Sequence, residues 1–138
     1  GKVLQVVNAT YSTQTDSTST SLADTGLTAT ITPSATSSKV LVHAMHQGWQ
    51  ALGVSSGGGA YLYRDASEIL QFDDGYGYNN TATRTRGGTI GCTYLDSPSS
   101  TSAVVYKTQF RNKIAASDAI CLQVNNVAST ITLLEIGA

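Results

Sequence analysis

The stretch LTATITPSATSSKVLVHAMHQ (Leu27–Gln47) holds two apolar runs separated by a polar, proline-containing segment. In the first run, apolar residues alternate with threonines up to Ile31, which is the period of a strand with one buried face. Pro33 has no backbone N–H to donate, so it ends this strand. The second run, Val40–Met45, is apolar on both faces, which predicts a strand covered on one side by the core and on the other by another sheet or subunit. The stretch therefore predicts a step from the edge of a β-sandwich into its core.

Thr, Ser, Gly and Ala dominate the composition, and only 12% of the 138 residues are charged. Strand-forming and turn-forming residues without a helical period predict an all-β fold of about eight to ten short strands. The length fits a single domain over residues 1–138. Gly1 stands directly before a strand, which suggests a piece of a longer chain. A surface so poor in charge suits chains that oligomerise or lie outside the cell.

The positions of turn-forming residues between apolar runs predict where strands and loops lie along the chain. A first strand is expected at Lys2–Val7, with a break at Asn8, and Ala60–Phe72 is expected to form a hairpin with a short turn. Two segments are predicted to be loops because glycine is concentrated in them. They are Gly48–Gly59, with three consecutive glycines, and Asp73–Gly88, with the sequence DDGYGYNNTATRTRGG.

Several function classes find no support. The net charge is −1 without a basic cluster, which argues against nucleic acid as a partner. No apolar run approaches the length of a membrane span. The glycine run lacks the Lys-Ser/Thr of a phosphate loop, and no Gly-x-Ser-x-Gly elbow is present. We therefore expect no enzyme, no cofactor and no metal site.

The histidines and cysteines are the residue types most often used in metal binding and nucleophilic chemistry. His43 and His46 lie three apart on one strand, so they point to opposite faces and cannot grip one metal. One is expected in the core and the other at a surface or a subunit contact. Cys92 and Cys121 lack zinc-type spacing, and buried free thiols are favoured over a disulfide between neighbouring strands.

Aromatic residues in the glycine-rich segments are the better binding signal. Flat apolar rings beside Asp, Asn and Arg are used in carbohydrate and protein recognition, although rings in loops also pack the loops down or fill a subunit contact. The acids could in principle hold calcium, but a solvated turn is favoured because the spacing does not match an EF-hand loop. The candidate receptor-binding residues are Trp49, Asp73, Asp74, Tyr76, Tyr78, Asn79, Asn80, Arg84 and Arg86.

The order of four segments is similar to that in a known family. They are KVLQVVNATYSTQTDSTSTSLADTGLTATITPSATSSKVLV (Lys2–Val42), YLYRDASEI (Tyr61–Ile69), TYLDSPSSTSAVVYKTQFR (Thr93–Arg111) and STITLLEIGA (Ser129–Ala138). Together they resemble the C-terminal head domains of tail-fibre and related virion proteins of marine and cyanobacterial phages. The resemblance implies a jelly-roll-like antiparallel β-sandwich of the tumour-necrosis-factor type. It also implies a homotrimer at the tip of a virion fibre, on the tail or on the capsid.

The family supplies no catalytic residues. The leading hypothesis is a non-enzymatic fibre head, attached to other virion proteins, that binds a host-surface glycan or protein through its loops. The alternative is a capsid-decorating or fibre-assembly domain that trimerises and binds no receptor. A depolymerase would need a pair of carboxylates in a groove.

Overall fold

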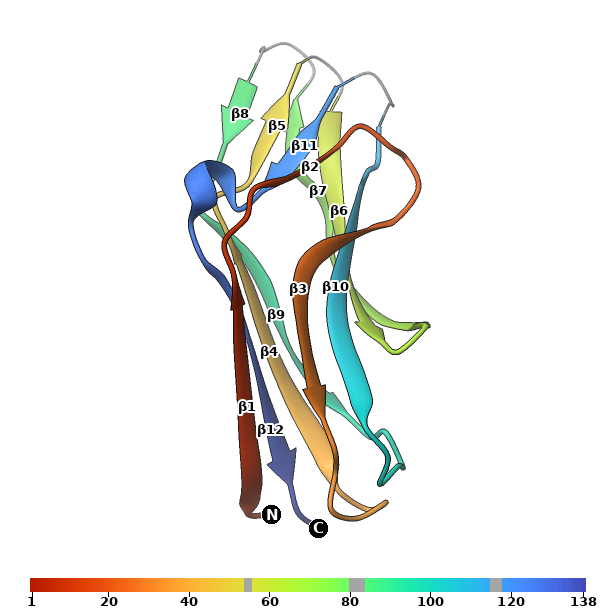
Figure 1. Ribbon diagram of the computed structural model, residues 1–138. Helices are drawn as coiled ribbons and strands as arrows, with labels where there is room; N and C mark the ends of the chain where they lie inside the picture. The colour runs from red at the N-terminus through yellow and green to blue at the C-terminus, as the bar shows by residue number, and fades with distance from the viewer. Residues whose placement is uncertain (54–55, 80–83, 115–117) are drawn as a thin grey trace.

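The computed structural model describes residues 1–53, 56–79, 84–114 and 118–138, and the side chain of Asn79 lies outside the described part. The described residues form twelve strands and one short 3-10 turn, η1 (Val124–Asn126). The strands make three four-stranded sheets, and all the strand pairs are antiparallel. Figure 1 shows an elongated body with both chain termini at one end.

The first sheet, called here the terminal sheet, contains both ends of the chain. Its strands, in spatial order, are β1 (Val3–Tyr11), β12 (Ser129–Ile136), β4 (Lys39–Gln47) and β9 (Thr89–Asp96).

The second sheet, called the facing sheet, packs against the terminal sheet. Its strands, in spatial order, are β3 (Ala23–Ile31), β10 (Val104–Asn112), β6 (Ser56–Arg64) and β7 (Ser67–Asn79). The third, called the distal sheet, consists of three-residue strands at the end opposite the termini (Figure 1). These are β2 (Thr15–Ser17), β11 (Ile120–Leu122), β5 (Gln50–Leu52) and β8 (Arg84–Arg86).

The opening stretch of the sequence crosses between the two long sheets. Strand β3 ends at Ile31, before Pro33, and lies at the edge of the facing sheet, whereas β4 lies inside the terminal sheet. The predicted edge-to-core step is therefore confirmed. The polar connection between the strands is held by the buried carboxylate of Glu135, which accepts hydrogen bonds from Ser34 N (2.7 Å), Ser34 Oγ (2.6 Å) and Ser38 Oγ (2.7 Å).

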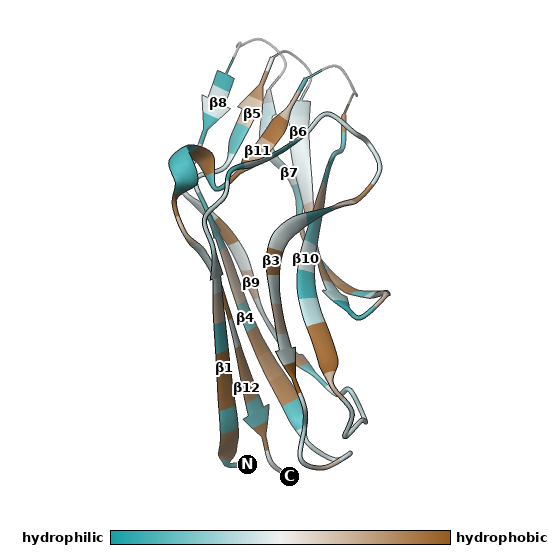
Figure 2. Ribbon diagram, viewed as in Figure 1, coloured by the Kyte–Doolittle hydropathy of each residue, from teal (hydrophilic) through white to brown (hydrophobic). Residues whose placement is uncertain are grey.

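The buried side chains of the described residues form two hydrophobic clusters. The larger lies between the terminal and facing sheets and is built from alternate residues of their strands, with Leu27, Val42, Leu62, Tyr106 and Leu133 among its members. Figure 2 shows the corresponding hydrophobic bands along β1, β4 and β12. The smaller cluster lies toward the distal sheet. This arrangement is the all-β, jelly-roll-like antiparallel sandwich that the sequence predicted.

For the second face of Val40–Met45, the alternative that another sheet of the same chain covers it was wrong. Val40, Val42 and Ala44 are fully buried, but on the opposite face His43 is exposed and Met45 is half-buried. Because the His43 side chain on that face is exposed, no other sheet formed by the described residues covers the face there. That a second subunit covers this face of β4 stays a prediction.

The break predicted at Asn8 was also wrong. Strand β1 runs without interruption from Val3 to Tyr11, paired along β12. The Asn8 amide nitrogen Nδ2 donates to Thr132 Oγ1 at 2.8 Å, so this polar residue sits within the ladder and does not end it.

The two segments predicted as loops are largely strands. The three consecutive glycines lie in buried β6, and β7 extends through Asp73 to Asn79. Gly58 pairs with Tyr76, and a Cβ on Gly58 would lie 1.9 Å from the Tyr76 ring. Glycine is therefore used here to admit an aromatic ring from the neighbouring strand, a role that differs from the flexibility we assumed. The hairpin after β6 is confirmed, with Asp65 in the left-handed region (φ 51°).

Candidate binding site

Most of the candidate residues lie on β7, on β8 and in the connection between β4 and β5. These elements belong to the half of the molecule away from the chain termini (Figure 1). Asn80 falls outside the described residues, as does the side chain of Asn79.

Tyr76 was expected to be an exposed recognition residue, and that expectation was wrong. Its side chain is 5% exposed and belongs to the smaller core cluster. Burial raises the pKa of its phenol well above the usual range. Its hydroxyl has no hydrogen-bond partner among the described residues. The ring packs against Trp49 with centroids 5.7 Å apart and planes tilted by 58°. Tyr76 therefore fills the core, which was the competing interpretation of these rings.

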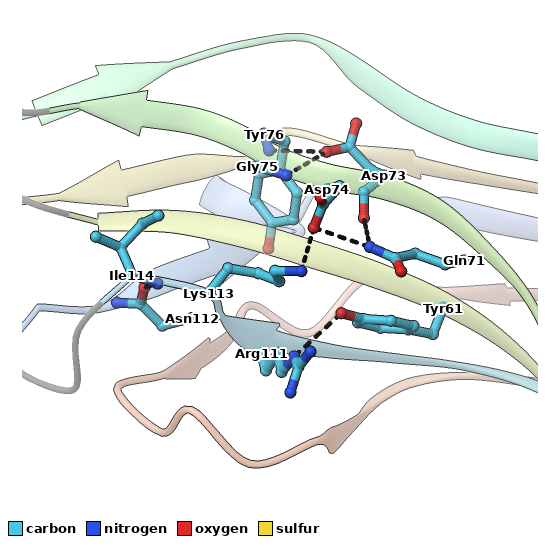
Figure 3. A network of polar contacts seen from close by, with 10 residues as sticks. All are labelled: Tyr61, Gln71, Asp73, Asp74, Gly75, Tyr76, Arg111, Asn112, Lys113 and Ile114. Atoms are coloured by element: carbon cyan, nitrogen blue, oxygen red, sulfur yellow. Dashed lines mark hydrogen bonds and ion pairs between the residues drawn. The ribbon is translucent and has the colours of Figure 1, made fainter.

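Asp73 and Asp74 are both engaged within the chain (Figure 3). Asp73 Oδ1 accepts hydrogen bonds from Gly75 N at 3.1 Å and Tyr76 N at 2.7 Å, which shapes the bend of β7. Asp74 forms an ion pair with Lys113 and accepts a hydrogen bond from Gln71 Nε2 at 2.9 Å. The Lys113 hydrogen bond holds the pKa of Asp74 below its usual range. The two carboxylates do not converge on one ligand position.

Beside Asp74, the outer surface of the facing sheet carries an aromatic ring covered by a cation. The Arg111 guanidinium carbon lies 5.4 Å from the centroid of Tyr61, and Arg111 Nε donates to Tyr61 Oη at 3.0 Å (Figure 3). The Arg111 guanidinium therefore has the Tyr61 ring and hydroxyl as its partners. This cluster stabilises the face of the sheet and offers no vacant partner.

Three further candidates keep exposed side chains, whereas Trp49 is half-buried and packs against the smaller core cluster. Tyr78 is 57% exposed, and Arg84 and Arg86 are exposed on β8. Among the described residues, no acidic side chain forms an ion pair with either arginine. These side chains are available to a ligand.

Trp49 and Arg86 line one pocket of about 390 Å³ at the junction of the terminal and distal sheets. Gly48, Gly87 and Gly88 line it as well, with Val124 and Val127. Backbone bonds from Gly87 N to Trp49 O (3.1 Å) and from Gly48 N to Gly88 O (2.8 Å) fix the two sides against each other. The structure thus brings together two of the candidates that are far apart in the sequence.

The histidines are placed as the sequence predicted, on opposite faces of β4. His46 is fully buried, with Nδ1 2.9 Å from Gln123 Oε1 and Nε2 2.8 Å from Thr108 Oγ1. Burial lowers its pKa to about 4, so the ring is neutral near pH 7. His43 lies on the outer face, 2.8 Å from Thr93 Oγ1.

Both cysteines are free thiols. Cys121 is buried and Cys92 is half-buried. Burial raises their pKa values, to about 12 for Cys121 and about 11 for Cys92. Both thiols are therefore protonated near pH 7, which does not favour attack by either as a nucleophile.

One surface feature was missed by the sequence analysis. Four apolar residues form a continuous row across the outer face of the terminal sheet, paired strand to strand as Val6–Leu134–Leu41–Leu95. Val6 is 60% exposed and Leu95 49% exposed. The neighbouring row, Asn8–Thr132–His43–Thr93, is polar and contains no Asp, Glu, Lys or Arg. In the sequence, the only sign of this apolar row is the alternation of apolar and polar residues within each strand. The row itself can be recognised only when the register between the strands is known.

None of the described segments forms a helix long and apolar enough to span a membrane. Among the same residues, no group of three His, Cys, Asp or Glu side chains is arranged to hold a metal ion.

No protein-family model and no curated protein matches this sequence. Among solved structures, the chain is similar to a structure of the infectious bursal disease virus Gx strain, with 12% sequence identity and a TM-score of 0.47. The alignment covers 99% of this chain and 33% of that chain, so this chain spans about a third of its length.

Proposed function

We propose that this chain is the head domain of a virion fibre, a non-enzymatic structural protein that assembles as a homotrimer. In this proposal the outer face of the terminal sheet forms the subunit contact, and the distal half meets a host-surface glycan or protein. The order of the four sequence segments and the jelly-roll-like fold support the virion assignment. The single observation that carries the assembly is the exposed apolar row.

The row Val6–Leu134–Leu41–Leu95 crosses all four strands of the terminal sheet without a charged residue. Contiguous exposed apolar surface on a soluble domain marks an interaction site, because leaving it in water costs about 25 cal/mol for each Å². A closed rotation about an axis alongside this sheet would bury the row of every copy at once.

The positions of the termini fit such an assembly. Both chain ends lie at one end of the body and the distal sheet at the other (Figure 1). Copies related by rotation about a single axis point the same way, so their termini would face a common stalk. The distal ends would then face away from the virion.

A fibre-assembly or capsid-decorating domain without receptor binding is the second candidate. The observation in its favour is that Tyr76, Asp73 and Asp74 are used in internal contacts. The subunit contact would be the same in both cases.

Light scattering of the fragment tests the assembly. We expect three times the 14.4 kDa chain mass, with and without reductant. Val6→Lys places a charge in the row without touching the core and should give monomers. Ile114→Lys, at a residue that is 44% exposed and outside the terminal sheet, is the matched control and should remain trimeric. A monomeric wild-type protein at micromolar concentration would refute the assembly. Host-cell binding by the trimer separates the two candidates.

A further inference from the structure

The pocket at Trp49 is built around the only tryptophan of the chain. Two glycines hold the indole in a narrow slot. A Cβ on Gly87 would lie 2.0 Å from Trp49 Cζ2, and a Cβ on Gly77 would lie 2.5 Å from Cζ3. Any side chain at either position would displace the ring. The missing side chains at these two positions therefore leave the space that the Trp49 ring occupies beside the pocket.

The rest of the wall combines apolar, cationic and uncharged polar groups, the last from Gln47 and Asn125. Val124 and Val127 supply apolar surface, and Arg86 supplies the charge. Arg86 is exposed, and no acidic side chain among the described residues forms an ion pair with it. Gly88 lines the pocket too, and a Cβ there would meet no atom within 4 Å. Packing therefore does not demand glycine at this position, and its missing side chain leaves the pocket open.

We propose that this pocket binds a sugar ring that carries a carboxylate, with the ring against Trp49 and the carboxylate on Arg86. This inference rests on the receptor-binding role proposed above and specifies the ligand class. The C–H face of a pyranose is apolar and matches a flat indole. A guanidinium pairs with a carboxylate through two parallel hydrogen bonds, which selects this anion by its planar shape. The volume of about 390 Å³ is at the small end of ligand sites, enough for one or two sugar rings.

The emission of the single tryptophan reports on this pocket directly. Excitation selective for tryptophan should show a saturable change on titration with glucuronic acid. Glucose has the same ring without the carboxylate and should bind at least about tenfold more weakly, the factor expected for one charge-assisted hydrogen bond. Acetate has the carboxylate without the ring and should cause no saturable change.

Two neighbouring arginines provide a matched pair of variants. Arg86→Gln should weaken glucuronic acid binding at least about tenfold, whereas Arg84→Gln, on the same strand but outside the pocket wall, should change it less than about twofold. Gly88→Leu should weaken binding without unfolding the protein, because the added side chain enters unoccupied space. Trp49→Ala is less useful, since Trp49 also packs against the core.

Equal affinity for glucose and glucuronic acid would overturn the proposal. So would a response to acetate as strong as that to glucuronic acid, or equal losses in the two arginine variants. Trimer mass and host-cell binding are measured on the same samples. If both persist while glucuronic acid fails to bind, the pocket inference is wrong and the proposed fibre-head function stands.

Discussion

Lowering the pH from 6.5 to about 4 should destabilise this fold through His46. Its imidazole is fully buried, and both ring nitrogens lie within hydrogen-bond distance of uncharged side chains, Gln123 and Thr108. Desolvation lowers the pKa of the ring from 6.5 to about 4, and the Gln123 contact only partly opposes this. Among the described residues, no charged side chain lies within hydrogen-bond distance of the ring to compensate a proton on it.

The magnitude follows from linkage between protonation and folding. Between pH 6.5 and about pH 4, the unfolded chain binds one proton that the folded chain does not, so the free energy of unfolding falls as the pH falls. The slope reaches about 1.4 kcal/mol per pH unit, and the full difference in pKa amounts to about 3 kcal/mol. The stabilisation from the neutral ring is complete above pH 6.5 and is lost by about pH 4.

Urea unfolding at about pH 7, about pH 5.5 and about pH 4.5 measures this loss directly. His46→Gln removes the titrating group and should flatten the pH dependence over this range, although the variant is less stable at neutral pH. His43→Gln is the matched control on the same strand, because His43 is exposed, and it should keep the wild-type slope. A wild-type stability that stays constant from pH 6.5 to 4.5, or an unchanged slope in His46→Gln, would refute the argument.

Further predictions concern the packing and the buried polar groups. Gly58→Ala should cost about 1–3 kcal/mol in unfolding free energy, because its Cβ meets the Tyr76 ring, whereas Gly88→Ala should be neutral or stabilising; urea titration of both variants checks the difference. Four hydrogen bonds hold the pKa of Glu135 at about 2, so its stabilising effect is present above pH 4.5 and should be lost as the pH falls toward 2. Glu135→Gln should make acid unfolding less steep in that range. Cys121 should react with a thiol reagent only after unfolding, because it is buried with its pKa raised to about 12; fast labelling of the native protein would contradict its placement.

Local patterns predicted the parts of the fold that local chemistry controls. Alternation up to Ile31 and the missing donor of Pro33 set where β3 ends, and the period of two placed His43 and His46 on opposite faces. The same patterns failed at Gly57–Gly59 and at Asp73–Tyr78, which are strands. Glycine reads as loop in the sequence because its backbone freedom is a local property. At Gly58, glycine is required because the Tyr76 ring of another strand occupies the space that a Cβ would need. This requirement depends on tertiary packing and not on the local sequence.

For the candidate site, the sequence selected residue types correctly but could not tell which were free to bind. Trp49 and Arg86 line the same pocket. Tyr76 is buried in the core, and Asp74 forms an ion pair with Lys113. These outcomes depend on residues that are distant in the chain from the candidates: Gly58 of β6 lies beside Tyr76, and Lys113, which follows β10, pairs with Asp74.

By itself, the sequence determined the all-β class and the strand that steps from edge to core, because side-chain period and proline act within a few residues. The tertiary structure alone decided the apolar row on the terminal sheet. Val6, Leu41, Leu95 and Leu134 are far apart in the chain, and antiparallel register sets them side by side. A register shift of one residue in any of these strands would move its apolar side chain from the outer face to the core face. The apolar row therefore exists only because the four strands pair in this register.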